Sequence, residues 1–326
     1  ALPISPLLGH LRLDSSLLGS FTLAILQGYV PHDGDGWGVA SNAVGHAVTV
    51  PPPSTGWPAA PTPLELFAAS NVELPPECAK LLGDFAQRVS QLGERTAELH
   101  LALRAELDED GTSHAPAFPL ERAEAQDVAE HAQQLAALVE RTEALLGAER
   151  HGVDVDLRGE LARLQPRLTA LQFAPAPLEG SPLQRIHGDL HLGQVLDSVG
   201  TWVFVDFEGE PSAPLPRRRA LRSPLEDVAG MLRSLDYCAR AQSHRPSDAV
   251  QSTLLAWSDW SQALYLSGWL ARGGRTLLGP LGAQDASTLL SWYLLRKALY
   301  ELHYELGSRP AWATIPLGSL QRLLRD

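Results

Sequence analysis

The chain has 326 residues, of which 44% are hydrophobic, so it is long enough for two lobes that share a cleft and can bury a full core. Its formal net charge of −12 argues against a nucleic acid or an anionic membrane surface as partner, because both attract clustered Lys and Arg. Two distant cysteines, no signal-peptide pattern and no run of roughly 18 apolar residues predict a cytoplasmic protein.

The first 50 residues are predicted to be extended. Apolar runs at 6–13 and 21–26 have the length of strands, with turn residues at Asp14 and Ser15 between them. A loop marked by Pro31 and three glycines follows at 29–38, and a proline-rich linker covers 51–63.

The rest of the chain is predicted to be mostly helical. Apolar residues at three-, four- and seven-residue spacings predict helices in this part, at 76–107, 120–148, 157–173, 224–242, 247–272, 284–307 and 315–325. Two short strands, 183–196 and 202–207, lie among these helices around a polar loop. Few strands followed by many helices indicate an α+β fold.

A motif of polar and charged residues begins at His187, in the string His-Gly-Asp-Leu-His-Leu-Gly-Gln over 187–194. Kinases with an H-R-D-x-x-x-x-N loop place there the aspartate that orients and deprotonates the attacking hydroxyl. Asp189 stands at the position of that aspartate, and Gln194, five residues later, stands at the position of the asparagine. We therefore predict that Asp189 is the general base and that His187 holds the loop through hydrogen bonds.

A second motif, Val-Asp-Phe-Glu-Gly-Glu over 205–210, stands where the same template has its metal-binding D-F-G. Two apolar runs around Gly200 predict a hairpin that brings Asp206 back beside Asp189. Because Mg²⁺ prefers oxygen ligands, Asp206 is the main predicted ligand, with Gln194 as a second and Glu208 as a further ligand or a substrate contact. A lone His-Gly-Asp triplet is common, and Asp206-Phe207-Glu208 alone also fits a strand end with solvated acids, but their order and spacing together favour a site.

Other candidates carry less weight. The glycines within 34–38 lack the strand–loop–helix context and the lysine of a phosphate-binding loop. His100 fits a histidine packed within a helix, and a substrate contact is the alternative. Three tryptophans on one predicted helix are expected in the core: Trp257, Trp260 and Trp269.

The two motifs together resemble those of maltokinases, a branch of the aminoglycoside-phosphotransferase-like kinases. The resemblance extends to the segments 214–219 and 223–234 and to the C-terminal string 297–306. It implies a protein-kinase-like fold with a mostly helical C-lobe, a catalytic β-hairpin and a residual piece of N-lobe sheet. It also implies that Asp227 braces the catalytic loop, and that Gln27, Tyr29 and Val30 form the nucleotide hinge.

The resemblance also implies a reaction: ATP and Mg²⁺ would be used to phosphorylate maltose to maltose 1-phosphate, feeding glycogen synthesis beside trehalose synthase. Residues 1–30 would be the remnant of the N-lobe with its hinge, and 31–326 the C-lobe with the catalytic loop 187–194 and the metal motif 206–210. His191 is assigned to the substrate.

The C-terminal string predicts the sugar contacts. On one helix, Lys297, Glu301 and Glu305 fall at i, i+4 and i+8, and Tyr300 and Tyr304 form an adjacent row. Charged groups that pair with hydroxyls and aromatic faces that cover a ring are what a sugar site requires. The alternative is a surface ladder from Lys297 to Glu301 with the tyrosines packed on a neighbour, although lysine before glutamate is the weaker orientation.

The pattern departs from that of complete kinases at its start. The only two lysines are Lys80 and Lys297, so none precedes the hinge, and no glycine-rich phosphate loop is present there. The expectation is therefore a chain shortened by its N-terminal cap and most of its N-lobe. Two alternatives stay open: a related kinase for an aminoglycoside or another sugar, and a sugar-binding lobe without catalysis.

Overall fold

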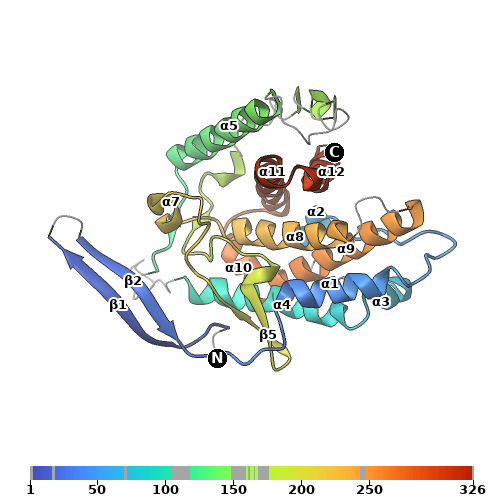
Figure 1. Ribbon diagram of the computed structural model, residues 1–326, viewed down its shortest axis with the longest axis horizontal. Coiled ribbons are helices and arrows are strands. Elements are labelled where there is room, and N and C mark those ends of the chain that lie inside the picture. Colours follow the sequence, from blue (N-terminus) through green and yellow to red (C-terminus); the bar gives the residue numbers. More distant parts are fainter. Residues whose placement is uncertain are drawn as a thin grey trace.

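The computed structural model of the chain describes residues 3–16, 19–69, 72–104, 118–147, 159–160, 162–164, 166–167, 176–242 and 247–324. In these residues, long helices stack into one body, and the hairpin of β1 (Leu7–Ser15) and β2 (Gly19–Gln27) projects from its side (Figure 1). This mixture of helices and small antiparallel sheets confirms the expected combination of helix and strand. None of the described helices is long and apolar enough to cross a membrane.

The remaining elements follow in chain order. The helices are α1 (Gly36–Ala47), α2 (Pro63–Ala68), α3 (Pro76–Leu82), α4 (Phe85–Ala102), α5 (Ala125–Gly147), α7 (Leu215–Arg219), α8 (Pro224–Ala241), α9 (Asp248–Trp269), α10 (Arg275–Leu278), α11 (Ala283–Ser308) and α12 (Thr314–Leu323). The short helical turns are η1 (Ala176–Leu178), η2 (Leu192–Gln194), the π-helical η3 (Leu270–Gly274) and η4 (Pro310–Trp312). The short strands are β3 (Glu121–Arg122), β4 (Pro182–Leu183), β5 (Val195–Ser198) and β6 (Thr201–Phe204).

The core lies where α4, α8, α9 and α11 pack together. The expected core tryptophans are buried, Trp257 and Trp269 fully. Two glycines allow α4 and α9 to touch at the backbone. A Cβ added to Gly93 would lie 2.0 Å from the carbonyl oxygen of Tyr265, and one added to Gly268 would lie 2.2 Å from that of Ser90. No side chain fits between the two helices at this crossing.

The extended structure predicted for the first 50 residues is wrong after residue 35, where α1 begins. Asp35 caps this helix by accepting a hydrogen bond from the backbone N–H of Gly38, at 2.8 Å. Ala40, Val44 and Ala47 form its buried face. The glycines at 36 and 38 suggested a loop, but Gly36 is needed for a close approach, because an added Cβ would lie 2.8 Å from the carbonyl oxygen of Leu192.

Several predicted boundaries also change. The helix expected over 76–107 is interrupted at Gly83, whose φ of 54° ends α3 before α4 begins. The helix expected over 120–148 starts later, at Ala125, because β3 pairs with β4 first. Most of the helix expected over 157–173 lies outside the described residues. The four C-terminal helices are confirmed within a few residues, as α8, α9, α11 and α12.

The predicted catalytic hairpin is present, but shorter than expected. β5 pairs antiparallel with β6, from Val195 opposite Phe204 to Ser198 opposite Thr201, and Val199 and Gly200 form the turn with positive φ. The strand expected over 183–196 is wrong between residues 184 and 194, which form no strand. There the backbone N–H groups of His187 and Gly188 donate to the side chain of Asp227 in α8.

The hairpin of β1 and β2 confirms the two strands expected near the start, although Asp14 and Ser15, expected in the turn, belong to β1. Two backbone hydrogen bonds hold its base: Phe204 N–H to the carbonyl of Pro3, and Gly28 N–H to the carbonyl of Pro6, both at 2.8 Å.

Candidate functional site

The loop that carries Asp189 is anchored by Asp227, in the first turn of α8. One carboxylate oxygen of Asp227 accepts from the backbone N–H of His187 at 2.8 Å, and the other accepts from that of Gly188 at 2.9 Å. Burial opposes the charge on Asp227, but the hydrogen bond from His100 and the loop N–H groups lower the pKa of Asp227 below its ordinary value. The ionised carboxylate therefore fixes the turn immediately before Asp189.

His187 links this loop to the predicted metal motif. Its Nε2 lies 2.8 Å from the carbonyl oxygen of Val205, which can only accept, so Nε2 donates. Its Nδ1 then accepts the longer contact, 3.4 Å, from the N–H of Asp189. The imidazole also packs against the ring of Phe207, with centroids 4.8 Å apart. These contacts give the His187 side chain a structural role, which is to join the two predicted motifs.

Gln194 makes a second connection between the same motifs. Its side-chain amide donates to the Oδ2 of Asp206 at 3.1 Å, and its backbone carbonyl accepts from the N–H of Val205 at 3.0 Å. Asp206 has a φ of 61°, which side chains with a Cβ rarely adopt. Such strain gathers at functional sites, where the surrounding structure holds it in place.

The oxygen donors near Asp206 fit a shared magnesium site better than a closed protein cage. Among the described residues, no group of three or more His, Cys, Asp or Glu side chains is placed to hold a metal ion. Mg²⁺ is commonly held by one or two carboxylates together with substrate phosphates. Asp206 and Glu208 are exposed, and Glu208 forms no hydrogen bond or ion pair with another described residue. These carboxylates fit an ion that arrives with a nucleotide.

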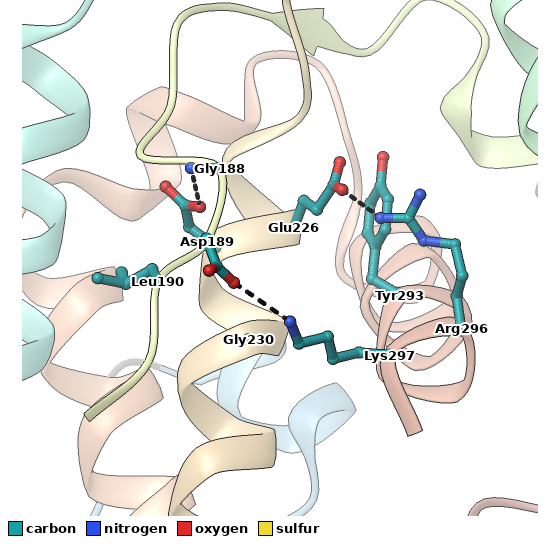
Figure 2. A pocket seen from close by; sticks show the side chains of 9 residues that line it. Gly188, Asp189, Leu190, Glu226, Gly230, Tyr293, Arg296 and Lys297 are labelled. Atoms are coloured by element: carbon teal, nitrogen blue, oxygen red, sulfur yellow. Dashed lines mark hydrogen bonds and ion pairs between the residues drawn. The ribbon is translucent and has the colours of Figure 1, made fainter. Parts of the chain in front are cut away.

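Asp189 lies opposite α11, where Lys297 points toward it (Figure 2). The Nζ of Lys297 is 3.5 Å from Oδ1 of Asp189, and the Nε2 of His191 is 4.0 Å from Oδ2. His191 also caps η2, since its Nδ1 accepts from the N–H of Gly193 at 3.1 Å. Burial lowers the pKa of His191 despite the nearby carboxylate, so His191 is neutral at neutral pH. Lys297 is therefore the cation closest to the predicted base among the described residues.

A further carboxylate, Glu210, completes this group. Its Oε2 is 3.9 Å from Nζ of Lys297, and its Oε1 accepts from the hydroxyl of Tyr300 at 3.0 Å. The ammonium of Lys297 also lies over the ring of Tyr300, 5.2 Å from its centroid. Burial raises the pKa of Tyr300 to about 12, so its hydroxyl stays a donor. Loop and helix thus present both charges and an aromatic ring beside Asp189.

The other two residues predicted on α11 are placed differently. Glu301 pairs with Arg233 of α8, at 2.6 Å, and not with Lys297, so the alternative of a Lys297–Glu301 surface ladder is wrong. Tyr304 is 49% exposed, and the guanidinium of Arg309 lies 5.8 Å from its ring centroid. Among the described residues, no hydrogen bond or cation–π contact joins Tyr304 to Asp189 or Lys297.

Beneath the loop lies a cavity of about 40 Å³, bounded by the loop, α8 and α11 (Figure 2). Glu226 lines this cavity and forms ion pairs with three arginines. Its partners are Arg296 of α11, Arg222 at 3.0 Å and Arg217 at 3.4 Å. Burial opposes ionisation of Glu226, but these guanidinium groups hold its pKa well below the ordinary value. Arg222 also fills the space beside Gly188, where an added Cβ would lie 2.1 Å from its Nη2.

The predicted hinge residues end the hairpin at its base. Gln27 closes β2 opposite Leu7, and Tyr29 is 81% exposed. The carbonyl of Val30 lies 2.8 Å from Nδ1 of His32. These contacts describe an exposed connection between hairpin and body, and a nucleotide role for these residues stays a prediction.

Two residues of the site were not expected from the sequence, Arg233 and Glu210. His100 is packed within its helix as expected and is fully buried, but its contact with Asp227 across 127 positions was not foreseen. Arg233 contacts Glu301 across 68 positions, so no local pattern indicates either pair. Glu210 could have been found, because it lies in the same acidic string as Asp206 and Glu208.

No family model matches the chain. It is 32% identical over 241 residues to a glucosamine kinase of Streptacidiphilus jiangxiensis, covering 73% of this chain and 49% of that protein. It is 29% identical over 169 residues to a glucosamine kinase of Mycolicibacterium smegmatis (strain ATCC 700084 / mc(2)155), covering 52% of this chain and 41% of that protein. The chain spans about half the length of the curated relatives it matches.

Solved structures show the same fold. A glucosamine kinase in crystal form B superimposes with a TM-score of 0.70 at 24% identity, over 99% of this chain and 66% of that one. A glucosamine kinase in complex with glucosamine, ADP and inorganic phosphate gives a TM-score of 0.71 at 24% identity, over 98% and 64%. The relatives and the solved structures are all glucosamine kinases, one of them in complex with ADP. They do not support maltose as the substrate or an association with trehalose synthase.

Proposed function

We propose that this chain forms the catalytic and acceptor-binding part of an ATP-dependent sugar kinase with a protein-kinase-like fold, and that its acceptor is an aminosugar such as glucosamine. The observation that carries the proposal is the double link between the two motifs: His187 to Val205, and Gln194 to Asp206. This link holds a candidate base and a candidate metal ligand in fixed relation, in a chain similar to glucosamine kinases.

In the proposed mechanism, Asp189 accepts the proton of the attacking sugar hydroxyl as it is phosphorylated. Lys297 orients Asp189 from one side, and His191 bounds the other side of the carboxylate. Asp206, with Gln194 and Glu208, would hold Mg²⁺, which supplies charge neutralisation on the phosphates when bound. These positions would hold the acceptor hydroxyl beside its base, which lowers the entropic part of the barrier.

The charges around Asp189 favour an aminosugar over a neutral sugar. The carboxylates of Asp189 and Glu210 both lie near the ammonium of Lys297. Two carboxylates beside one ammonium leave an excess of negative charge. An acceptor with its own ammonium would offset that excess.

The proposed division of the chain follows the same scheme. Residues 1–30 would be part of the N-lobe and the nucleotide hinge, with Gln27, Tyr29 and Val30 near the adenine. Residues 31–326 would be the C-lobe. The exposed hairpin of β1 and β2 and the packed body of helices fit this division.

Maltose is the second candidate acceptor. It is favoured by the motif string 187–194 with 205–210, and by the aromatic and charged residues of α11. In that case Tyr300, Glu301 and Tyr304 would contact the disaccharide, and Tyr304, being half exposed, would cover the second glucose unit.

The experiment is a nucleotide-release assay over glucosamine, glucose, maltose and an aminoglycoside, with calorimetric titration of the same compounds. The expected result is a preference for glucosamine in both measurements. A preference for maltose would replace the acceptor and keep the reaction. The absence of both turnover and binding with every sugar tested would refute the proposal. Two matched variants sharpen the test. Glu210→Gln should weaken the binding of glucosamine more than that of glucose, whereas Glu208→Gln should change the binding of both sugars equally.

A further inference from the structure

A chain of hydrogen bonds leads from α9 through α4 to the catalytic loop. The indole N–H of Trp269 lies 3.1 Å from Nδ1 of His100, and Nε2 of His100 lies 3.1 Å from Oδ2 of Asp227. Asp227 then accepts from the N–H groups of His187 and Gly188. The side chains of Trp269 and His100 are fully buried, so water does not compete for these bonds.

The donors and acceptors assign the proton on His100. An indole nitrogen can only donate, so Nδ1 of His100 must accept. Its proton is therefore on Nε2, from which it is donated to Asp227. An imidazolium would place an N–H on Nδ1, opposite the N–H of Trp269, and would lose that bond. Trp269 thereby holds His100 as a neutral ring with one defined tautomer.

The packing around the two rings fixes their direction. The Trp269 ring stands edge-on to His100, at 80° with centroids 6.2 Å apart. Gly274 of η3 leaves room for the indole, because an added Cβ would lie 2.3 Å from its Cε3 atom. Gly268, next to Trp269, lies against the backbone of α4. The helix crossing therefore sets the distance between Trp269 and His100.

His100 contacts the catalytic segment a second time, through its backbone. Its carbonyl accepts from the side-chain amide of Gln184 at 2.7 Å, and Gln184 pairs through its backbone with Arg222. The segment entering the catalytic loop and the residue beneath Gly188 are thus tied to the same turn of α4.

We infer that His100 and Trp269 are positioning residues, which orient the Asp227 carboxylate and through it the loop that carries Asp189. This inference rests on the proposed kinase function for its effect on turnover, whereas the tautomer of His100 and the order of the loop can be measured without any substrate. The titratable and charged groups around Asp227 are His100 from α4, His187 from the loop, Tyr265 from α9 and Arg222.

The first test uses long-range ¹H–¹⁵N spectra of the whole chain with ¹⁵N-labelled histidine, with His100→Gln assigning the His100 signals by their loss. The expected result at neutral pH is a protonated Nε2 and an unprotonated Nδ1. In Trp269→Phe, Nδ1 loses the indole donor, and its ¹⁵N chemical shift should move. A ring that is already charged in the unmodified protein, or the opposite tautomer, would overturn the inference.

The second test measures amide hydrogen exchange of the peptide over 184–194. His100→Leu removes the donor and should speed exchange there by about tenfold or more, the fold-change for losing a hydrogen bond to a charged group. His100→Gln keeps both a donor and an acceptor and should restore slow exchange. Equal exchange in both variants, or faster exchange spread over α4 and α9 alone, would show a packing role only.

The third test is turnover with the best acceptor found for the protein. His100→Leu and Trp269→Phe should lower kcat, by about tenfold or more for the first, while KM for ATP and sugar stays within twofold. His100→Gln should recover kcat. If the unmodified chain phosphorylates nothing, the kinase proposal fails while the spectra and exchange still decide this one.

Discussion

The helical body and the hairpin of β1 and β2 differ in how far their side chains are buried. In the body, even charged groups are buried and paired: Asp236 is 1% exposed and accepts from three arginines. In the hairpin, large apolar side chains stand in solvent. Four leucines of the two strands are between 48% and 63% exposed: Leu7, Leu11, Leu13 and Leu26.

This contrast shows which contacts hold the candidate site in place. The candidate site is held by pairs between distant helices, such as Arg233 with Glu301 and His100 with Asp227. The hairpin is held by its ladder and by two hydrogen bonds at its base. Changes in the body should therefore reach the site, whereas equivalent changes in the hairpin should remain local.

The largest effect is expected from Asp189→Asn, which removes the proposed base. Turnover should fall by about 10²–10⁴-fold, the usual contribution of a positioned base, with little change in ATP affinity. Steady-state kinetics on the best acceptor measure it, with Asp14→Asn in the hairpin as the matched control. A loss of less than threefold would remove Asp189 from the mechanism.

The buried charges should dominate stability. Asp236→Ala leaves Arg233, Arg240 and Arg322 without their shared carboxylate and should cost about 3–5 kcal/mol of unfolding free energy. Asp14→Ala breaks an exposed pair with Arg12 and should cost at most about 1 kcal/mol. Chemical denaturation of both variants gives the comparison. Equal costs would contradict the contrast between the two regions.

Two glycines with similar backbone angles allow a finer comparison. Gly188 has φ 87° with Arg222 beside it, and Gly19 of β2 has φ 80° with nothing within 4 Å. Gly19→Ala should cost about 1–2 kcal/mol for the left-handed backbone alone. Gly188→Ala should cost about 2–4 kcal/mol, because Arg222 must also leave Glu226. Thermal and chemical unfolding test whether the difference has this sign.

Acid should act on the body first. Burial opposes the charge on Asp236, but Arg240, Arg233 and Arg322 lower its pKa from the ordinary 3.8. A depressed folded pKa contributes stability that is present above the unfolded value and lost as pH falls further. Unfolding free energy should therefore decline below about pH 4, and Asp236→Asn should flatten this decline. A slope unchanged by the substitution would assign acid sensitivity to other carboxylates.

Local patterns predicted the long helices and the short hairpins, because apolar periodicity and turn residues are properties of neighbouring positions. They failed at α1, where Asp35 and a close approach at Gly36 override the usual meaning of glycine. They also failed within 184–194, where Asp227 satisfies the backbone that a strand would otherwise have paired.

For the site, the order of the motifs predicted which loops come together. The link between Gln194 and Asp206 lies within the reach of one hairpin, so spacing was enough to expect it. The partner of Glu301 was not predictable, because Arg233 lies on another helix. Lys297, one turn away on the same helix, pairs with Asp189 instead. Pairing between helices depends on packing that no single window of sequence contains.

The scarcity of lysine gives the molecule a natural chemical label. Lys80, at the surface of α3, and Lys297, beside Asp189, are its only two lysine side chains. An amine-reactive reagent followed by mass spectrometry would report on the site at one position and on bulk reactivity at the other. Protection of Lys297 relative to Lys80 would then count site occupancy directly, in unpurified mixtures of sugars and without a coupled enzyme.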